Sequence, residues 1–206
     1  MQIACLDLEG VLIPEIWVEF SKRCSIPELA RTTRDEPDYD KLMRGRIALL
    51  KQHRLGLQDI QEVIAGMRPL EGAKEFLDAL RDRMQVVILS DTFYQFAAPM
   101  MRQLGMPALL CHELEVDDAG RVRGYRLRMR DQKCASVEAF RALNFRTIAV
   151  GDSYNDTTML GAAHAGILFC PPANVIAEFP QYPVTRNYRE LMREIERAAH
   201  SPKENR

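Results

Sequence analysis

The sequence predicts an α/β protein: a Rossmann-like parallel sheet with helices on both faces, plus a small all-helical cap inserted after the first strand. Two observations lead to this prediction. Short apolar runs alternate with amphipathic segments, which favours parallel strands joined by helical crossovers. The second observation concerns the stretch 14–68, where apolar residues recur at helical spacing and no strand pattern occurs, which predicts the helical insertion.

Apolar runs bounded by turn residues predict the strands. The buried strands are expected at 3–6, 85–89, 108–111, 147–150 and 165–170. Residues 113–129 alternate around Asp117-Asp118-Ala119-Gly120, which is typical of a hairpin. We therefore expect one hairpin beside a sheet that is otherwise built from crossover connections.

Helices fill the intervals between these strands. Inside the insertion they are expected at 15–24, from 39 to about 53 with Asp38 as a cap, and from 58, while prolines keep 25–37 a loop or short turn. Further helices are expected to end near 83, to run over 93–104, to begin near 131, to pass through 159–160, and to span 174–179 and 188–199. This pattern divides the chain into a core, 1–13 with 69–206, and a helical cap, 14–68.

Composition narrows the class of protein. The chain of 206 residues is 47% hydrophobic and 28% charged, as expected for a globular protein with one sizeable core. Its formal charge of −1 argues against nucleic acid and anionic membranes as partners, and no apolar run is long enough to span a membrane. Five scattered cysteines without metal spacing predict reduced thiols in a cytoplasmic protein. The oligomeric state is left open, with a homodimer among the alternatives.

Polar side chains follow several of the predicted strands directly. Because the carboxyl ends of parallel strands share one edge of the sheet, these side chains are expected to converge there. Gly10 in addition lets the chain turn sharply after the first strand. The converging residues are Asp7 and Glu9 after the first strand, Ser90 and Asp91 after the second, and Asp152, Asn155 and Asp156 after the strand at 147–150.

These residue types suit phosphoryl transfer. Carboxylates such as Asp7, Asp152 and Asp156 are the ligands that Mg²⁺ prefers, and the Ser90 hydroxyl with the Lys133 ammonium suits a phosphate. Asp7 is the expected nucleophile and Glu9 its proton partner, through an aspartyl-phosphate intermediate. The alternatives are ordinary ones: Ser90-Asp91-Thr92 can be a plain helix cap, and Lys133 a surface lysine.

Taken together, the segments 7–11, Ser90, Lys133 and 151–156 resemble, in order, the motifs of the haloacid dehalogenase superfamily. The insertion after the first motif is similar to the small cap of the phosphoserine phosphatase branch. The wording Asp-Leu-Glu-Gly-Val is close to a subgroup described as bifunctional phosphoserine phosphatase and homoserine phosphotransferase enzymes.

The resemblance implies a role for each matching residue. Asp7 would take the phosphoryl group, and Glu9 would protonate the leaving alcohol and then activate water. Mg²⁺ would be bound by Asp7, the backbone carbonyl of Glu9 and Asp152, with Asp156 supporting the metal site. Ser90, Asp91, Lys133 and Asn155 would lie around the phosphate and substrate. In the cap, Glu15 would bind the substrate's amino group and Arg46, favoured over Arg44, its carboxylate by a bidentate contact.

The sequence departs from the family pattern at two positions. Most phosphatases of the superfamily have Asp where this chain has Glu9, and Glu15 lies one residue closer to the nucleophile than is typical. Three alternatives to phosphoserine hydrolysis remain: transfer from phosphoserine to homoserine, hydrolysis of another small phosphomonoester, and a phosphate-accepting receiver domain. The insertion and Glu9 argue against the receiver domain.

Overall fold

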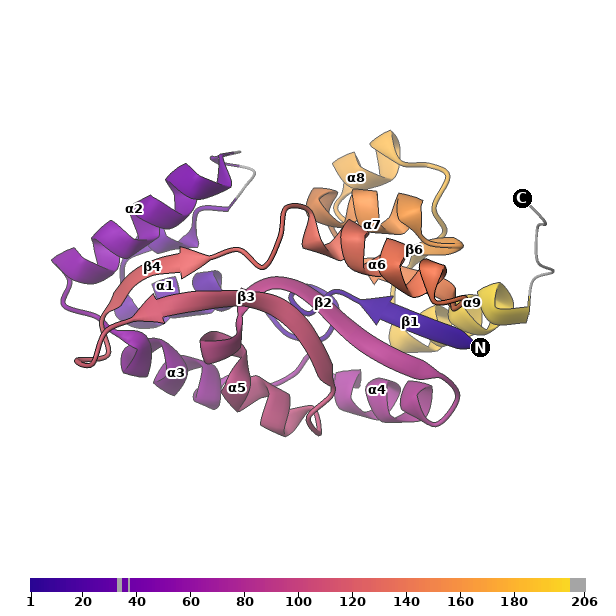
Figure 1. The fold of residues 1–206 in the computed structure, drawn as a ribbon, viewed down its shortest axis with the longest axis horizontal. Coiled ribbons are helices and arrows are strands. Elements are labelled where there is room, and N and C mark those ends of the chain that lie inside the picture. The colour runs from indigo at the N-terminus through magenta and orange to yellow at the C-terminus, as the bar shows by residue number, and fades with distance from the viewer. Residues whose placement is uncertain (33–34, 37, 201–206) are drawn as a thin grey trace.

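A mixed sheet of seven strands organises residues 1–32, 35–36 and 38–200, which the computed structural model describes (Figure 1). Its strand order is β4-β3-β2-β1-β5-β6-β7, and every neighbouring pair is parallel except β3 and β4. The strands are β1 (Gln2–Leu6), β2 (Gln85–Phe93), β3 (Ala108–Val116), β4 (Val122–Arg126), β5 (Arg146–Gly151), β6 (Ala165–Phe169) and β7 (Val184–Thr185). The predicted fold class is confirmed.

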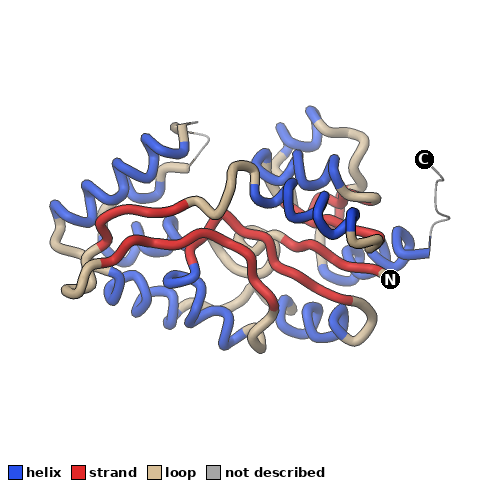
Figure 2. Tube along the Cα trace, viewed as in Figure 1, coloured by secondary structure: helices blue, strands red, loops and turns tan. Residues whose placement is uncertain are grey.

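Helices cover both faces of this sheet, as the tube view makes plain (Figure 2). Alternating side chains of β1 point to opposite faces: Ile3 and Cys5 pack in one hydrophobic cluster, Ala4 and Leu6 in the other. The first cluster includes α6 (Gln132–Ala142), α7 (Thr157–Ala162) and α8 (Ala173–Glu178), and the second α4 (Ala73–Arg81), α5 (Tyr94–Gln103) and α9 (Tyr188–His200). Because both faces are buried, the central strands are continuously apolar.

The insertion after β1 holds α1 (Ile16–Cys24), the 3₁₀ turn η1 (Pro27–Ala30), α2 (Tyr39–Gln52) and α3 (Leu57–Gly66). Helix α3 packs on α1 and on α5 of the core, and α2 lies beside β4 (Figure 1). Apolar side chains of all three helices join the hydrophobic cluster that contains α4, α5 and α9. Strand β4 of the hairpin therefore packs against α2 of the insertion. That the insertion is a separate cap unit stays a prediction.

Local sequence signals account for several of these boundaries. The Asp38 side chain accepts a hydrogen bond from the Lys41 N–H (3.1 Å) and so caps α2, as predicted. In the β3–β4 turn, Asp117 Oδ1 accepts from the N–H groups of Ala119 and Arg121, both at 3.0 Å. Of the loop expected at 25–37, residues 27–30 form η1, while 33–34 and 37 lie outside the described residues.

Some elements differ from the sequence prediction. Strand β2 continues to Phe93, which is buried and pairs with His112 of β3 after a register shift, so α5 begins only at Tyr94. The alternative that Ser90-Asp91-Thr92 caps a helix is therefore wrong. Strand β3 is continuous over Ala108–Val116, whereas the sequence predicts a strand at 108–111 and a separate hairpin at 113–129. Strand β7 is not predicted, because two residues are too few to show a periodic pattern.

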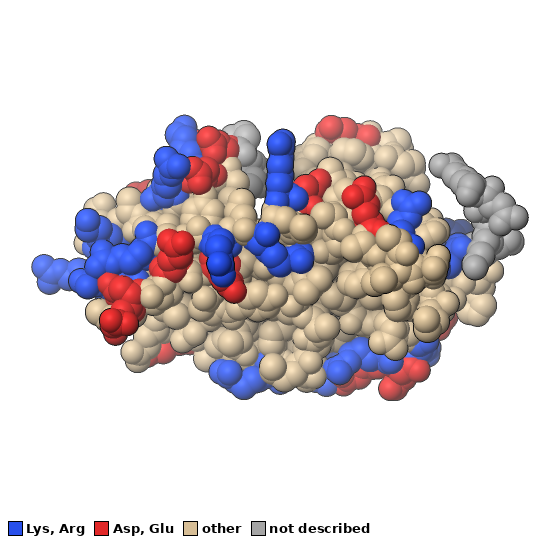
Figure 3. Space-filling model, viewed as in Figure 1, with Lys and Arg blue, Asp and Glu red and all other residues tan. Residues whose placement is uncertain are grey.

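The molecular surface carries mixed charge. Figure 3 shows Lys and Arg interspersed with Asp and Glu on the face drawn, and Arg123 of β4 pairs with Asp117 at 2.8 Å. In the same view the outline is notched at its upper edge, between the part formed by α2 and the part formed by α6 to α8. Among the described helices, none has the length and apolar character that crossing a membrane requires.

Candidate active site

Asp7 follows β1 at the edge where the parallel strands end. Its N–H donates to the Val150 carbonyl (2.9 Å), which extends the β1–β5 ladder by one residue, and its Oδ1 accepts from the Leu8 N–H (2.8 Å). The side chain is buried. Gly10 then turns the chain at φ +78°, and a Cβ there would lie 2.5–2.6 Å from the carboxyl atoms of Asp152. Only glycine fits both the backbone angle and the space beside Asp152.

Lys133 lies in the first turn of α6, as predicted, but it is fully buried and is no surface lysine. Its ammonium group is 2.9 Å from Asp7 Oδ1, 2.7 Å from Asp156 Oδ1 and 3.6 Å from Asp91 Oδ2. Burial alone would lower the pKa of Lys133, but the charges of Asp156, Asp7 and Asp91 raise it well above its ordinary value. These carboxylates therefore favour the protonated, cationic form of the amine.

Asp156 organises the loop after β5. Its Oδ2 accepts hydrogen bonds from the N–H groups of Asp152 (3.0 Å) and Ser153 (3.2 Å), and its Oδ1 accepts from Lys133. A Cβ at Gly151 would lie 2.3 Å from the Asp156 Cβ, so glycine lets this side chain fold back over the strand end. With both oxygens engaged by the protein, Asp156 is suited to orient Asp152 and Lys133. Its role in supporting a metal site stays a prediction.

The carboxylates of Asp7, Asp152 and Asp156 form a cluster in which one oxygen of each lies within 4.8 Å of the others. Burial and the charge of Asp156 raise the pKa of Asp7 well above its ordinary value, against the opposing charge of Lys133. The single ammonium group of Lys133 thus does not neutralise the carboxylates of Asp7, Asp152 and Asp156. Asp7 must nevertheless be ionised to act as a nucleophile, so a further positive charge is needed. An all-oxygen, negatively charged donor set of this kind fits a hard divalent cation such as Mg²⁺.

Asp91 lies near the end of β2, and its carboxylate is already held by the protein. Asn155 Nδ2 donates to Oδ2 (3.2 Å), while Gln132 Nε2 (3.4 Å) and His112 Nε2 (3.5 Å) approach Oδ1. Burial would raise the pKa of Asp91, but Lys133 and the hydrogen bonds from His112 and Asn155 lower it below its ordinary value. The contact of Asp91 with substrate stays a prediction. In the structure, Asp91 Oδ2 lies between Lys133 and Asn155 and contacts both.

Ser90, the predicted phosphate ligand, is buried one residue before Asp91. Its hydroxyl oxygen accepts from the Thr92 N–H at 3.3 Å, and its carbonyl accepts from Gln132 Nε2 at 2.8 Å. Gln132 therefore ties the end of β2 to the start of α6. This bond fixes the strand that carries Ser90 relative to the helix that carries Lys133.

Glu9 and Glu15 form a second group, at the start of α1. Glu9 Oε2 accepts a hydrogen bond from the Ile16 N–H (2.8 Å), so the side chain caps the first helix of the insertion. Burial and the adjacent Glu15 raise the pKa of Glu9 to about 8, with Ile16 and Arg46 opposing the shift. Glu9 can therefore carry a proton at neutral pH, as a general acid must. Glu15 is exposed beside it.

Arg46 belongs to this second group, although it lies on α2. Its Nη2 donates to the Arg31 carbonyl (2.7 Å), while its Nε is buried and has no hydrogen-bond partner within residues 1–32, 35–36 and 38–200. Burial lowers the pKa of Arg46 to about 10, and the electrostatic influence of Tyr39, Glu9 and Glu15 opposes this shift. Arg44, the alternative left open by the sequence, is exposed and ion-paired with Asp40. Of the two arginines, Arg46 has the free donor close to Glu9 and Glu15.

The predicted residues thus fall into two sets. Direct contacts join Asp7, Asp91, Lys133, Asn155, Asp152 and Asp156, with Ser90 attached through Gln132, and electrostatic proximity joins Glu9, Glu15 and Arg46. The expected metal contact of the Glu9 carbonyl stays a prediction. Sequence reasoning missed Gln132 and His112, and also Tyr39, whose hydroxyl donates to the Asp91 carbonyl at 3.2 Å. None of them stands in a motif; only the position of Gln132 before Lys133 could have indicated it.

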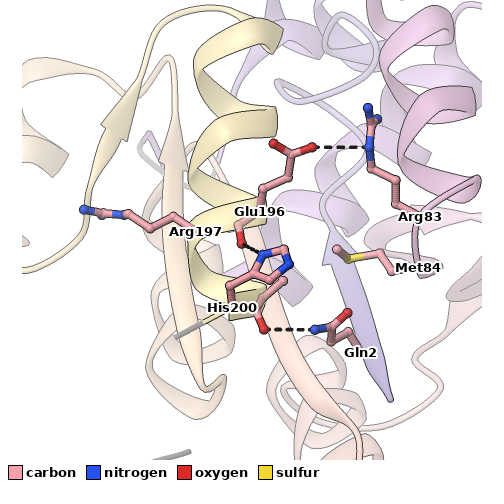
Figure 4. A pocket seen from close by; sticks show the side chains of 7 residues that line it. Gln2, Arg83, Met84, Glu196, Arg197 and His200 are labelled. Carbon is pink, nitrogen blue, oxygen red and sulfur yellow. Dashed lines mark hydrogen bonds and ion pairs between the residues drawn. The ribbon is translucent and has the colours of Figure 1, made fainter. Parts of the chain in front are cut away.

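A hollow of about 750 Å³ lies at the opposite end of the sheet (Figure 4). There Gln2 Nε2 donates to the Ala199 carbonyl (2.9 Å) and Arg83 pairs with Glu196 (3.2 Å). This hollow adjoins the amino end of β1 and the end of α9. Because ligands of parallel α/β sheets bind outside the carboxyl ends of the strands, the hollow is not the place for the predicted chemistry.

Comparison with known proteins identifies the family of this chain. The family model of haloacid dehalogenase-like hydrolases matches residues 1–164, which include all the motif residues above. Phosphoserine phosphatase ThrH of Pseudomonas aeruginosa is 62% identical over 199 residues, covering 97% of each chain. A phosphoserine phosphatase of Pseudomonas syringae pv. tomato is 59% identical, covering 97% of this chain and 84% of its own.

Solved structures agree on the fold. A substrate-bound phosphoserine phosphatase superposes with a TM-score of 0.78 at 22% identity, covering 94% of this chain and 97% of the other. A phospho-aspartyl intermediate analogue of phosphoserine phosphatase gives 0.77 at 21% identity, covering 94% and 98%. At this level of identity the likeness concerns the arrangement of elements, and it includes the insertion because the coverage is nearly complete.

Proposed function

This chain belongs to the haloacid dehalogenase-like hydrolases, and from that premise we propose that it hydrolyses O-phosphoserine to serine and phosphate through an aspartyl-phosphate intermediate. The observation that carries the proposal is the buried Lys133 ammonium between Asp7 and Asp156 at the strand ends. An ionised carboxylate beside a fixed cation is what a phosphoryl acceptor requires. The names of the two Pseudomonas relatives support the substrate.

The chemistry assigned to the chain's own residues has two halves. An Asp7 oxygen attacks phosphorus, the bond from phosphorus to the serine oxygen breaks, and Glu9 gives its proton to that oxygen. Water then attacks phosphorus, Glu9 takes a proton from it, and the Asp7 carboxylate is regenerated. Lys133 and Ser90 bind the phosphoryl oxygens in both halves.

Asp7 and Asp152, with Asp156 behind them, are the residues that would hold Mg²⁺. A bound Mg²⁺ would supply charge neutralisation at the phosphoryl group. The excess of carboxylates over the single Lys133 ammonium supports this assignment. Removing divalent cations with EDTA is therefore expected to abolish turnover, and Mg²⁺ to restore it.

Recognition of the amino acid is assigned to Glu15 and Arg46. The carboxylate of phosphoserine would pair with the Arg46 guanidinium, whose Nε has no partner in the described part of the chain, and its ammonium group would pair with Glu15. A buried donor left without a partner costs free energy unless a ligand satisfies it. This is the argument for an amino acid over another small phosphomonoester.

The test is phosphate release from O-phosphoserine by three proteins. We expect the wild type to release phosphate and Arg46→Ala to raise KM about 10- to 100-fold, since a charged hydrogen bond is lost. Arg44→Ala, an exposed neighbour, is the matched control and should keep the wild-type KM. If wild type prefers a phosphomonoester without an amino acid part, or Arg46→Ala matches Arg44→Ala, the substrate assignment is wrong.

Transfer to homoserine is the second candidate, and it rests on the motif resemblance of residues 7–11 to the bifunctional subgroup. Homoserine has the amine and carboxylate of serine, so Glu15 and Arg46 would bind it in the same way. Mass spectrometry of a reaction containing phosphoserine and homoserine should then detect phosphohomoserine. A product mixture with serine and free phosphate only would leave hydrolysis as the activity.

A further inference from the structure

Trp17, the one tryptophan of the sequence, lies under the guanidinium of Arg46. The Arg46 Cζ is 4.5 Å from the centre of the indole ring, within the range of a cation–π contact. Both side chains are more than nine-tenths buried, at 8% exposure each. The contact is therefore largely shielded from water, and cation–π interactions are strongest when water is excluded.

The indole ring is in turn fixed by the core. Phe96 of α5 meets it edge-on with ring centres 5.3 Å apart, and Phe20 of α1 does so at 6.2 Å. Helix α5 directly follows β2, the strand that carries Ser90. Trp17 thus connects the insertion to the same core segment that leads out of the phosphate side of the site.

Arg46 has few other contacts that could set the plane of its guanidinium. Nη2 donates to the Arg31 carbonyl (2.7 Å), Nη1 approaches the Met43 sulfur at 3.7 Å, and none of the residues that the structure describes is a partner of Nε. A single strong hydrogen bond leaves the planar group free to rotate about it. Bidentate binding of a carboxylate requires that two donors keep one plane.

We propose that Trp17 is a positioning residue for substrate recognition: its ring holds the guanidinium plane of Arg46 in the orientation that receives the substrate carboxylate. The proposal rests on the proposed function, in which Arg46 binds that carboxylate. It assigns to Trp17 no contact with substrate and no part in phosphoryl transfer. Its loss should therefore weaken binding and leave the chemical step intact.

Steady-state kinetics with phosphoserine test this directly. We expect Trp17→Leu to raise KM about tenfold, corresponding to the loss of a buried cation–π contact, with kcat within about twofold of wild type. Trp17→Phe keeps an aromatic face and should restore part of the affinity. Ile60→Ala, a buried apolar loss on α3 with no assigned substrate residue, should leave KM within about twofold.

Intrinsic fluorescence supplies a second readout that needs no substitution at Trp17. Since the chain has a single tryptophan, Arg46→Ala should change the position or intensity of its emission, while Arg44→Ala should not. An unchanged emission in Arg46→Ala would overturn the proposal, as would a KM in Trp17→Leu that rises no more than in Ile60→Ala.

The kinetics also separate the two proposals. If Arg46→Ala raises KM and the Trp17 variants do not, only the positioning role is wrong. If Arg46→Ala itself leaves KM unchanged, the carboxylate assignment fails first and the role of Trp17 falls with it.

Discussion

The two proposed halves of this site, a phosphoryl side around Asp7 and a recognition side around Arg46, are built differently. Around Asp7 the protein pairs its own charges, because the Lys133 ammonium lies near Asp7, Asp156 and Asp91. Asn155 and Gln132 also contact the Asp91 carboxylate. On the insertion, Arg46 keeps a buried donor that has no partner among the described residues, and Glu15 lies beside Glu9 of the loop that follows β1.

The difference follows from what each side must do. A phosphoryl group is the same in every substrate, so the groups that bind it can be held rigidly by strand ends and a helix. The groups proposed to bind an amino acid take its carboxylate and amine as partners. They therefore lack hydrogen-bond or charge partners when no substrate is bound. The preorganised half lies at the strand ends and on α6, and the incomplete half lies mainly on the insertion.

The largest effect is expected from Lys133→Met, which breaks the preorganised side. Phosphoserine turnover should fall about 10³-fold, because a fixed charge at the phosphoryl group is lost. In EDTA the free energy of unfolding should fall by about 3–5 kcal/mol, since buried carboxylates lose their counter-charge. Urea unfolding and steady-state kinetics measure both.

The stability loss in Lys133→Met should also depend on pH. Without the ammonium, the pKa of Asp7 rises further above its unfolded value, so the folded state binds more protons than the unfolded chain and stability falls as pH rises. The deficit should be larger at about pH 8 than at about pH 5. Lys22→Met, at an exposed lysine paired with Glu19, is the control and should change stability by less than about 0.5 kcal/mol. A deficit equal at both pH values would contradict the charge assignment.

A smaller effect is expected from Gly10→Ala. The new methyl group would meet the Asp152 carboxyl at 2.5–2.6 Å and the positive φ would be strained, so the free energy of unfolding should fall by about 1–3 kcal/mol. Displacing Asp152 should also raise the Mg²⁺ concentration needed for half-maximal activity.

Gly45→Ala is the matched comparison for that substitution. Gly45 lies within α2 with open space around its Cβ position, so alanine there should stabilise the protein by about 0.5–1 kcal/mol and leave the Mg²⁺ requirement unchanged. Equal effects of the two substitutions would show that Gly10 is not needed beside Asp152.

The smallest effect is expected from Tyr39→Phe, which removes the one hydroxyl of α2 that bonds the Asp91 backbone. Losing this hydrogen bond should weaken phosphoserine binding by about 0.5–1.5 kcal/mol, seen as a rise in KM of a few fold. Tyr94→Phe loses an equivalent bond to the Leu109 carbonyl outside the insertion and should not change KM. If both variants behave alike, Tyr39 does not link the insertion to the site.

The preorganised side was also the more predictable from sequence. Asp7 and Ser90 directly follow apolar runs, Asp152 and Asp156 lie shortly after a third, and the carboxyl ends of parallel strands meet at one edge of the sheet. What the sequence did not predict is how these groups pair, because burial of Lys133 depends on packing between α6 and the sheet.

On the recognition side the sequence predicted residues but not their geometry. The choice of Arg46 over Arg44 followed from a motif resemblance, whereas its stacking on Trp17 joins residues far apart in the chain. The extension of β2 to Phe93 had the same cause: Phe93 packs with Phe96 and pairs with β3, and such long-range pairing overrides local preference.

Mass spectrometry of the protein, quenched in acid during phosphoserine turnover, locates the phosphoryl group on the chain. We expect it on the peptide that contains Asp7, and we expect none in Asp7→Asn or without Mg²⁺. A phosphoryl group on another residue, or full turnover by Asp7→Asn, would contradict it.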